Sequence, residues 1–477
     1  MKLLTNYIYP LILIMVCFGC TDDFDELNSN PNQPELVSAD LILPKVINTA
    51  ANTMALEAWN EGNVVAQLTA KINFTDFDRY LWGSNSNLWD AFYGNLRDVS
   101  NILVIAEESG NVNYRATALI MRAWMFSILT DSWGDIPFSE ATKAKVDGII
   151  QPIYDEQETI YDGILADLEE ANSIIDLTGN QISGDLLYNG DMLKWKKLAN
   201  SLRIRSLMRI SNKRDVGSAI QSIIDSQPVL ESNDDNALME YLPAQPNTWP
   251  VHTYRVGSFD EYRLSLTIEG VLKDLSDPRL TTWFRPTDNP SDDPDLYAGM
   301  PNGLSENNAS NYNGGASNVS RCGPIMYEEP NSVDAVIMQY AELQFIMAEA
   351  AQKGWITGDD KEYYENGVTA SFEYWDVPMP ADYLTRADVS YDGQLQTIMT
   401  QKWLASFLVG FEAWYDYRRT GYPDFSVPGP DNVNNDNVPV RFLYPANQQT
   451  LNKENYDAAV SRQGPDDINT KVWWERN

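Results

Sequence analysis

The chain has 477 residues and an acidic composition, with 68 Asp and Glu against 34 Lys and Arg and a formal net charge of −34. This charge argues against a nucleic-acid partner, because phosphates would be repelled. The only histidine is His252, which excludes a metal site built from several histidines and leaves one residue for any Ser-His-Asp arrangement. We interpret His252 as a packed or surface residue.

The first 19 residues have the pattern of a secretory signal peptide. The apolar segment 8–18 follows the basic Lys2 and is too short to span a bilayer as a free helix. Gly19 supplies the small residue that a signal peptidase requires, so Cys20 is the expected first residue of the mature chain. The pattern resembles the lipobox of bacterial lipoproteins, although Cys17 stands where that motif prefers Leu. We predict lipid attachment at Cys20 and no crossing of the membrane by the mature chain.

An acidic run, TDDFDE, follows Cys20 and begins a predicted tether over residues 20–39. The run resembles the surface-export signal of lipoproteins in Bacteroidota, and the alternative is an ordinary solvated tether. Once Cys20 carries lipid, Cys322 is the one cysteine left, so no disulfide is expected within the chain. Residues 40–477 show no low-complexity linker, and we predict a single domain there.

Helical periodicity dominates this predicted domain. Apolar residues recur with helical spacing in segments near 40–58, 61–74, 86–109, 113–131, 156–176, 213–226 and 360–375. In GDMLKWKKLANSLRIRSLMRIS, Trp195, Leu198 and Leu202 form one face and Asp191 is placed to cap the helix. In YAELQFIMAEAAQKGW the same spacing ends at Gly354, and a further stripe runs from Leu404 to Phe411. These patterns predict a mainly all-α fold of helix pairs, with packing like that of tetratricopeptide repeats.

The second half is predicted to be irregular, as a loop-rich insertion at about 228–333. From about 284 to 333 the chain is rich in Asn, Ser, Gly, Pro and Asp, with scattered aromatic residues. Such a long segment inside a compact protein is usually functional or disordered, and the aromatic residues favour order.

Six stretches in chain order resemble the SusD/RagB family of outer-membrane nutrient-binding lipoproteins, and its SusD-like branch in particular. They are RATALIMRAWMFSILTDSWGDIPFSEA, WKKLANSLRIRSLMRIS, LSDPRL, AELQFIMAEAAQKGW, QKWLASFLVGFEAWYDYRRTGYP and INTKVWWER. The resemblance implies an all-helical, tetratricopeptide-like scaffold with an irregular second half. It also implies a non-enzymatic cell-surface lid that captures a polymer or oligomer for a SusC-like TonB-dependent transporter.

Two of these stretches have a structural interpretation that we favour over contact with the transporter. In DSWGDIPF, Gly134 and Pro137 would end a helix while Trp133 packs over the turn. In FEAWYDYRRTGYP, the residues Arg418 and Arg419 would pair with Glu412 or Asp416 at helical spacing, and Trp414 would fill the core.

A glycan site requires aromatic rings for the sugar faces and amides for the hydroxyls. Two regions have this composition. DRYLWGSNSNLW supplies Tyr80, Trp82 and Asn85, and the loop-rich half supplies Trp249, Tyr254, Trp283, Tyr297 and Tyr312 as candidate ligand-binding residues. The alternative is that most of these rings are buried, since 14 Trp and 25 Tyr exceed the needs of one site.

The sequence leaves the cargo and one alternative function open. The predicted cargo is an oligo- or polysaccharide, with peptide or glycopeptide capture as the alternative for the same kind of transporter. A secreted glycoside hydrolase is the alternative from another class, because 68 acidic residues always offer a carboxylate pair. No cofactor is predicted. TDNPSDDPDL and GPDNVNNDNVP could supply oxygen ligands to calcium, but Asn, Asp and Pro clusters are ordinarily turns.

Overall fold

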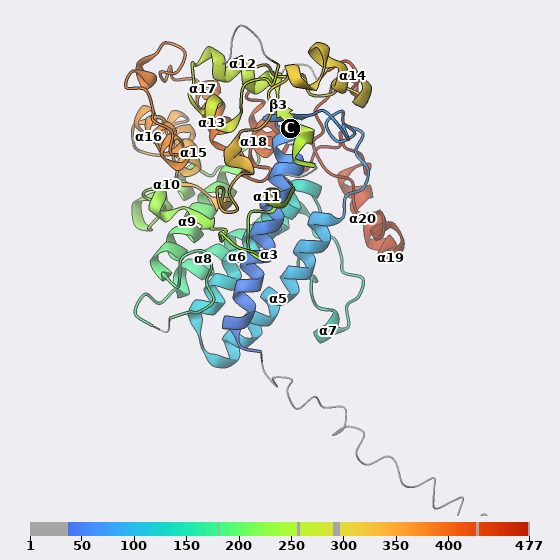
Figure 1. Ribbon diagram of the computed structural model, residues 1–477. Coiled ribbons are helices and arrows are strands. Elements are labelled where there is room, and N and C mark those ends of the chain that lie inside the picture. Colours follow the sequence, from blue (N-terminus) through green and yellow to red (C-terminus); the bar gives the residue numbers. More distant parts are fainter. Residues whose placement is uncertain (1–36, 180, 255–257, 290–295, 426–428, 476–477) are drawn as a thin grey trace, which may run out of the picture. The chain divides into compact units, whose positions relative to one another are not determined.

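The computed structural model describes residues 37–475 except 180, 255–257, 290–295 and 426–428, so Cys20 and the start of the predicted tether lie outside the described residues. The compact unit that begins at Ala39 is mainly helical, which confirms the predicted fold class (Figure 1). No helix in the described part of the chain is long and apolar enough to cross a membrane.

Consecutive helices of the first half pack against one another. Helix α3 (Ala39–Glu57) contacts α5 (Asn87–Ser109), which contacts α6 (Val112–Trp133), and α6 contacts α8 (Gln157–Ile174), which contacts α9 (Met192–Arg209). A second group follows, in which α15 (Tyr340–Gln352) and α16 (Asp360–Tyr374) pair and both contact α17 (Leu395–Ala405). Two of these pairs, α5 with α6 and α15 with α16, are joined by short turns, as the sequence predicts.

The ends of these helices follow from local side-chain chemistry. Asp191 caps α9, because its carboxylate accepts hydrogen bonds from the backbone N–H groups of Leu193 and Lys194. Gly354 has φ +69° just after α15, as the sequence predicts for a left-handed stop. The remaining helices are α4 (Asn63–Val65), α7 (Ala144–Asp147), α10 (Gly217–Ser226), α11 (Pro250–Tyr254), α12 (Leu266–Asp274), α13 (Arg279–Trp283), α14 (Glu306–Asn311), α18 (Glu412–Thr420), α19 (Gln448–Leu451) and α20 (Lys453–Gln463).

The predicted helix over 61–74 is wrong. A π-helix, η1 (Ala58–Gly62), and the short α4 continue α3, and the chain then forms strand β1 (Thr69–Lys71). β1 pairs antiparallel with β3 (Tyr262–Leu264), and β2 (Ala237–Met239) pairs with β4 (Ala335–Met338). Gln67, with φ +54°, separates α4 from β1. Residues 62–72 are all buried, so helical and extended spacing of the apolar residues in this part of the segment could not be distinguished.

The apolar stripe from Leu404 to Phe411 is also not one helix. α17 ends at Ala405 and α18 starts at Glu412, and between them Leu408 and Gly410 have φ values of +63° and +50°. The stripe residues are nonetheless buried. The reversal brings Gly410 against η1, where a Cβ added at Gly62 would lie 2.0 Å from the Gly410 carbonyl oxygen.

Part of the irregular half packs around a small core that it shares with the β1 segment, while other buried residues of this half, such as Trp249 and Trp283, belong to the main core. The small core consists of Ala70, Ile72, Met300, Leu304, Ala309 and Val319. Short 3₁₀ turns run through the region, at η4 (Tyr312–Gly314), η5 (Ala316–Asn318) and η6 (Pro324–Met326). Apolar side chains from β1 and the loops therefore hold the irregular backbone in place.

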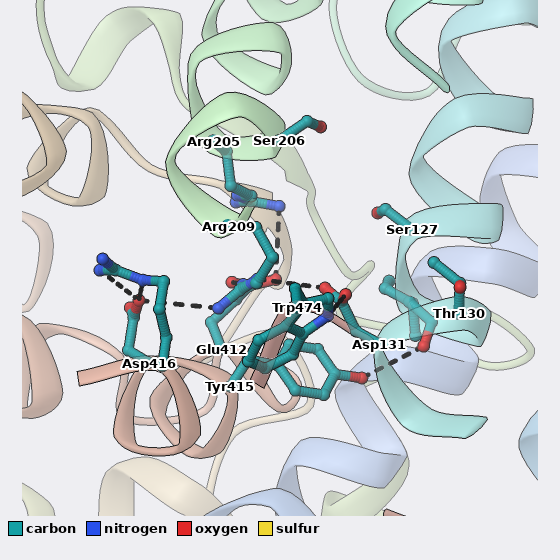
Figure 2. A network of polar contacts seen from close by, with 12 residues as sticks. Ser127, Thr130, Asp131, Arg205, Ser206, Arg209, Glu412, Tyr415, Asp416 and Trp474 are labelled. Carbon is teal, nitrogen blue, oxygen red and sulfur yellow. Dashed lines mark hydrogen bonds and ion pairs between the residues drawn. The ribbon is translucent and has the colours of Figure 1, made fainter. Parts of the chain in front are cut away.

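A buried network of ion pairs joins α6, α9 and α18 (Figure 2). Arg209, at the end of α9, lies 3.1 Å from the Asp131 carboxylate and 3.6 Å from that of Asp416, and it also contacts Glu412. Arg205, one turn earlier, pairs with Glu342. Such buried charges require partners, because each ion has lost its hydration.

The predicted structural role of FEAWYDYRRTGYP is confirmed, except that one of its two arginines has a different ion-pair partner. Arg419 pairs with Asp416 at 3.1 Å, as predicted, and makes two further contacts of 2.6 Å with Glu349. Arg418 pairs instead with Glu475, and these two side chains are 0% and 1% exposed. Trp414 is fully buried. Helical spacing could not reveal Glu475, because it lies 57 residues away.

The 3₁₀ turn η8 (Trp473–Glu475) closes this network against α6. The indole N–H of Trp474 donates to Asp131 over 2.8 Å, and the Tyr161 hydroxyl donates to the same oxygen. Burial raises the pKa of Asp131 to about 6, although Arg209 opposes the shift. Burial alone would raise the pKa of Asp416 as well. Lys402, at 2.6 Å, and Arg419 instead hold the pKa of Asp416 well below its usual value.

Candidate functional site

A pocket of about 420 Å³ lies beside the start of α5 and combines aromatic rings with amides. Its wall consists of the segment 81–87, with Glu61 from η1, Phe77 and the distant Phe442. Two of the predicted ligand-binding residues, Trp82 and Asn85, are brought together here. A larger hollow of about 650 Å³ beside α18 is lined mainly by polar side chains. The smaller pocket has the composition that a sugar ring requires.

Trp82 is held by other aromatic rings. Its ring stacks on Phe77 with centroids 4.6 Å apart and lies 5.1 Å from the ring of Phe442. Its indole N–H donates to the Phe77 carbonyl oxygen over 2.9 Å. Trp82 is half-buried, so part of the side chain remains at the pocket surface. The rings form a fixed aromatic wall, which costs little side-chain entropy when a ligand binds.

Asn85 connects this wall to a carboxylate. Its Nδ2 donates to Glu61 Oε1 and Oε2 over 3.0 and 3.2 Å. Its Oδ1 accepts from the backbone N–H of Asn87 over 2.9 Å, which fixes the turn into α5. The positions of Glu61 and Asn85 are therefore set by each other and by the start of a helix.

The Glu61 carboxyl has a perturbed environment. Burial and the charge of Glu57 raise the pKa of Glu61 well above its usual value, while Asn85 and Lys71 act in the opposite direction. Burial raises the pKa of Glu57 to about 7. Glu61 lines the pocket and Glu57 does not, so the two carboxyl groups do not face each other across it. A hydrolase would require both carboxyl groups to flank one bound sugar.

Three of the predicted ligand-binding residues are buried instead. Tyr80 is 3% exposed and has φ +66°, which turns it away from its neighbour Trp82 and into the interior. Trp249 is fully buried, and its indole N–H donates to the Met326 carbonyl oxygen over 2.8 Å. Trp283 is fully buried and stacks on Phe407 with centroids 4.6 Å apart. These three rings pack in the protein core, so the expectation that they contact the ligand is wrong for this structure.

Two further predicted residues, Tyr297 and Tyr312, do not line the pocket. Tyr297 is half-buried against the main core, and Tyr312 is half-buried against the small core of the irregular half. The side chain of Tyr254 lies outside the described residues. Sequence reasoning missed Glu61, Phe77 and Phe442. The separation of Phe442 from the segment 81–87 leaves no local signal for it.

The two acidic loops differ in how much of them is described. Most of TDNPSDDPDL lies outside the described residues. In GPDNVNNDNVP, Asp431 accepts hydrogen bonds from Ser305 and Asn308, and Asp436 accepts one from Asn432. These carboxylates stabilise turns. Among the described residues, no cluster of three or more His, Cys, Asp or Glu side chains is placed to hold a metal.

Residues 31–445 match the SusD-like family described as "Starch-binding associating with outer membrane". The chain belongs to the SusD-like family. SusD-like proteins are outer-membrane-associated binding proteins and not enzymes, so the hydrolase alternative is excluded. The predicted family and the predicted absence of catalysis are therefore confirmed.

Solved SusD-like structures cover nearly the whole chain. A SusD homologue from Bacteroides fragilis has 28% identity and a TM-score of 0.79, with 93% of this chain and 100% of that chain covered. A protein from Bacteroides vulgatus, whose name refers to nutrient binding and the outer membrane, has 32% identity, a TM-score of 0.80 and coverage of 92% and 100%. A chitin-binding protein has 27% identity, a TM-score of 0.81 and coverage of 92% and 100%. A comparison with curated proteins finds no match.

Proposed function

We propose that this SusD-like protein is a cell-surface lipoprotein, anchored through Cys20, that binds a glycan and delivers it to a SusC-like TonB-dependent transporter. The observation that carries the proposal is the pocket in which Trp82 and Phe77 meet Asn85 and Glu61. Sugar C–H faces pack on aromatic rings, and sugar hydroxyls bond to amides and carboxylates. The chitin-binding relative supports a glycan as the class of ligand.

Substitution of Trp82 by alanine tests the ligand site. Loss of the aromatic wall is expected to raise the Kd for the bound glycan about tenfold or more, because tenfold corresponds to only about 1.4 kcal/mol. The measurement is isothermal titration of the full mature protein in detergent against a panel of oligosaccharides and peptides. Trp355→Ala is the control, since Trp355 is also half-buried but does not line the pocket. Binding of peptides alone would replace the glycan with a peptide cargo, and release of cleaved product would contradict the proposal.

An exposed group of aliphatic side chains at one end of the helical unit supports the transporter partnership. We call it the aliphatic end. Its residues lie at the starts of α3, α6 and α9, near the end of α5 and in the loop after α8, and they are 40–64% exposed: Leu41, Val104, Val112, Leu177, Leu186 and Leu193. Single exposed aliphatic residues are normal, but a concentrated group indicates an interaction surface.

The loop after α8 links the three helix starts at this end. The Tyr114 hydroxyl of α6 donates to the Ser183 carbonyl oxygen over 3.2 Å, and the Trp195 indole of α9 donates to Asp185 over 2.8 Å. A Cβ added at Gly184 would lie 2.3 Å from the Asp40 carbonyl oxygen of α3. The described chain enters the unit at this same end, at the start of α3 (Figure 1). A tether from Cys20 would therefore keep the aliphatic end on the side of the membrane and its transporters.

Replacing Leu41 with lysine is expected to reduce the fraction of the transporter that is recovered with the lipoprotein from solubilised membranes. A charged side chain at an apolar contact leaves an ammonium desolvated and unpaired. Leu451→Lys is the matched control, because Leu451 is 66% exposed against 64% for Leu41 and lies in α19. Equal recovery of the transporter with both variants would remove the aliphatic end from the interface.

A further inference from the structure

We propose that the pocket beside Trp82 is selective for a sugar that carries a primary ammonium group, so that the preferred ligand is an amino-sugar glycan. This inference rests on the proposed function and specifies the class of its ligand. It is carried by the charge and the aromatic content of the pocket wall.

The pocket wall contains a carboxyl group that has no ion-pair partner among the described residues. Glu61 is the one ionisable residue among the described residues that line the pocket. Lys71 is the cation that acts on Glu61, but its ammonium is already engaged with Glu261 at 3.1 Å and lies 4.8 Å from the centre of the Tyr262 ring. In the part of the chain that the structure describes, no cation forms an ion pair with Glu57 or Glu61. An ammonium could favour ionisation of Glu61 and pair with it, whereas an acidic sugar would find no cation in the pocket wall.

The aromatic wall is suited to the same ligand. Phe77 and Trp82 stack with an interplanar angle of 10°, and Phe442 completes the wall. The faces of aromatic rings attract cations, and Trp does so most strongly. A carboxylate beside aromatic faces therefore offers an ammonium both an ion pair and a cation–π contact.

The burial of the carboxyl pair makes the missing countercharge significant. Glu57 is 7% exposed, and Glu61 is half-buried and bonded to the Asn85 amide. Two neighbouring carboxyl groups with little access to water favour the neutral form, and an ammonium in contact with Glu61 would favour its ionised form. The ligand would supply a positive charge for Glu61, because Lys71 is paired with Glu261.

A matched pair of ligands tests this selectivity. Titration at neutral pH, where part of the sugar amine is charged and Glu61 ionises more readily than in acid, compares a β-1,4-linked glucosamine hexamer with its fully N-acetylated counterpart. We expect the full mature protein in detergent to bind the amino form on the order of tenfold more tightly, which corresponds to one good charged contact. A polygalacturonate oligomer is expected to bind more weakly than either.

Two variants distinguish the effect of the pocket carboxylate on ligand preference from the effect of the protein's overall charge. Glu61→Gln keeps a hydrogen-bonding oxygen for Asn85 but removes the charge, and it should abolish the preference for the amino form over the acetylated form. Asp76→Asn removes the same charge from an exposed side chain outside the pocket and should preserve the preference. Equal binding of the two hexamers by the unaltered protein, or a preference that survives Glu61→Gln, would overturn the inference alone. Binding of neither hexamer, with binding of a lysine-containing peptide, would overturn both the inference and the proposed glycan cargo.

Discussion

Replacing Arg209 with alanine is expected to lower the free energy of unfolding by about 3–5 kcal/mol, the typical effect of removing one partner from a buried ion pair. The substitution removes the ion-pair partner of Asp131 among the described residues and leaves Glu412 with Arg205 alone, at 3.7 Å; both carboxylate side chains are at most 9% exposed. The Asp416 carboxylate keeps Lys402 and Arg419. Urea denaturation followed by circular dichroism measures the change.

The control for Arg209 is a surface pair. Lys453 lies 2.6 Å from Asp457 one helical turn away, with side chains 66% and 52% exposed. Lys453→Ala is expected to change the free energy of unfolding by about 0.5 kcal/mol or less, because water screens an exposed pair. Similar losses for the two variants would mean that the buried network contributes no more than an exposed one.

Replacing Gly62 with alanine is expected to lower the free energy of unfolding by about 3 kcal/mol, at the upper end of the usual cost of overpacking. The added methyl group would lie 2.0 Å from the Gly410 carbonyl oxygen, and a backbone atom cannot move aside as a flexible side chain can. The backbone conformation is not the obstacle, because Gly62 has φ −60° and ψ −51°. Because Glu61 precedes Gly62, the substitution should also weaken ligand binding at the pocket.

A second glycine provides a control of opposite sign. Gly94 lies inside α5, and a Cβ added there would have no atom within 4 Å. Gly94→Ala should raise the free energy of unfolding by up to about 1 kcal/mol, because alanine is the better helix former. Thermal unfolding of the two variants should therefore shift in opposite directions. A Gly62→Ala protein as stable as the unaltered chain would show that η1 and Gly410 can separate without cost.

The helical scaffold could be predicted from the sequence because its signals are local. Asp191 precedes an apolar stripe at helical spacing, and the structure places a capped helix there. The prediction of a helix over 61–74 failed because residues 62–72 are all buried, which removes the polar face on which helical periodicity depends. The prediction of one helix from Leu404 to Phe411 failed because the chain reverses at Leu408. That reversal is set by the close approach of Gly410 to Gly62, which lies far away in the sequence.

The candidate site could be predicted only in part. Trp82 and Asn85 lie in one short loop whose composition suits a sugar, and the structure places them in one pocket. Trp249 and Trp283 have similar neighbours in the sequence, yet both are fully buried. Composition does not determine which way a ring faces. Glu61 and Phe442 could not be assigned because they reach the pocket through long-range packing alone.

The position of Glu475 and Trp474 in the buried network has a consequence for the order in which the chain can fold. Trp474 meets Asp131 across a separation of 343 residues, and Glu475 is the ion-pair partner of Arg418. A chain that emerges amino-terminus first would hold Asp131 and Arg418 without these partners until residues 474 and 475 have emerged. Because the buried network would form late, the chain would remain unfolded for longer during synthesis. An unfolded chain is the state that a secretion channel requires.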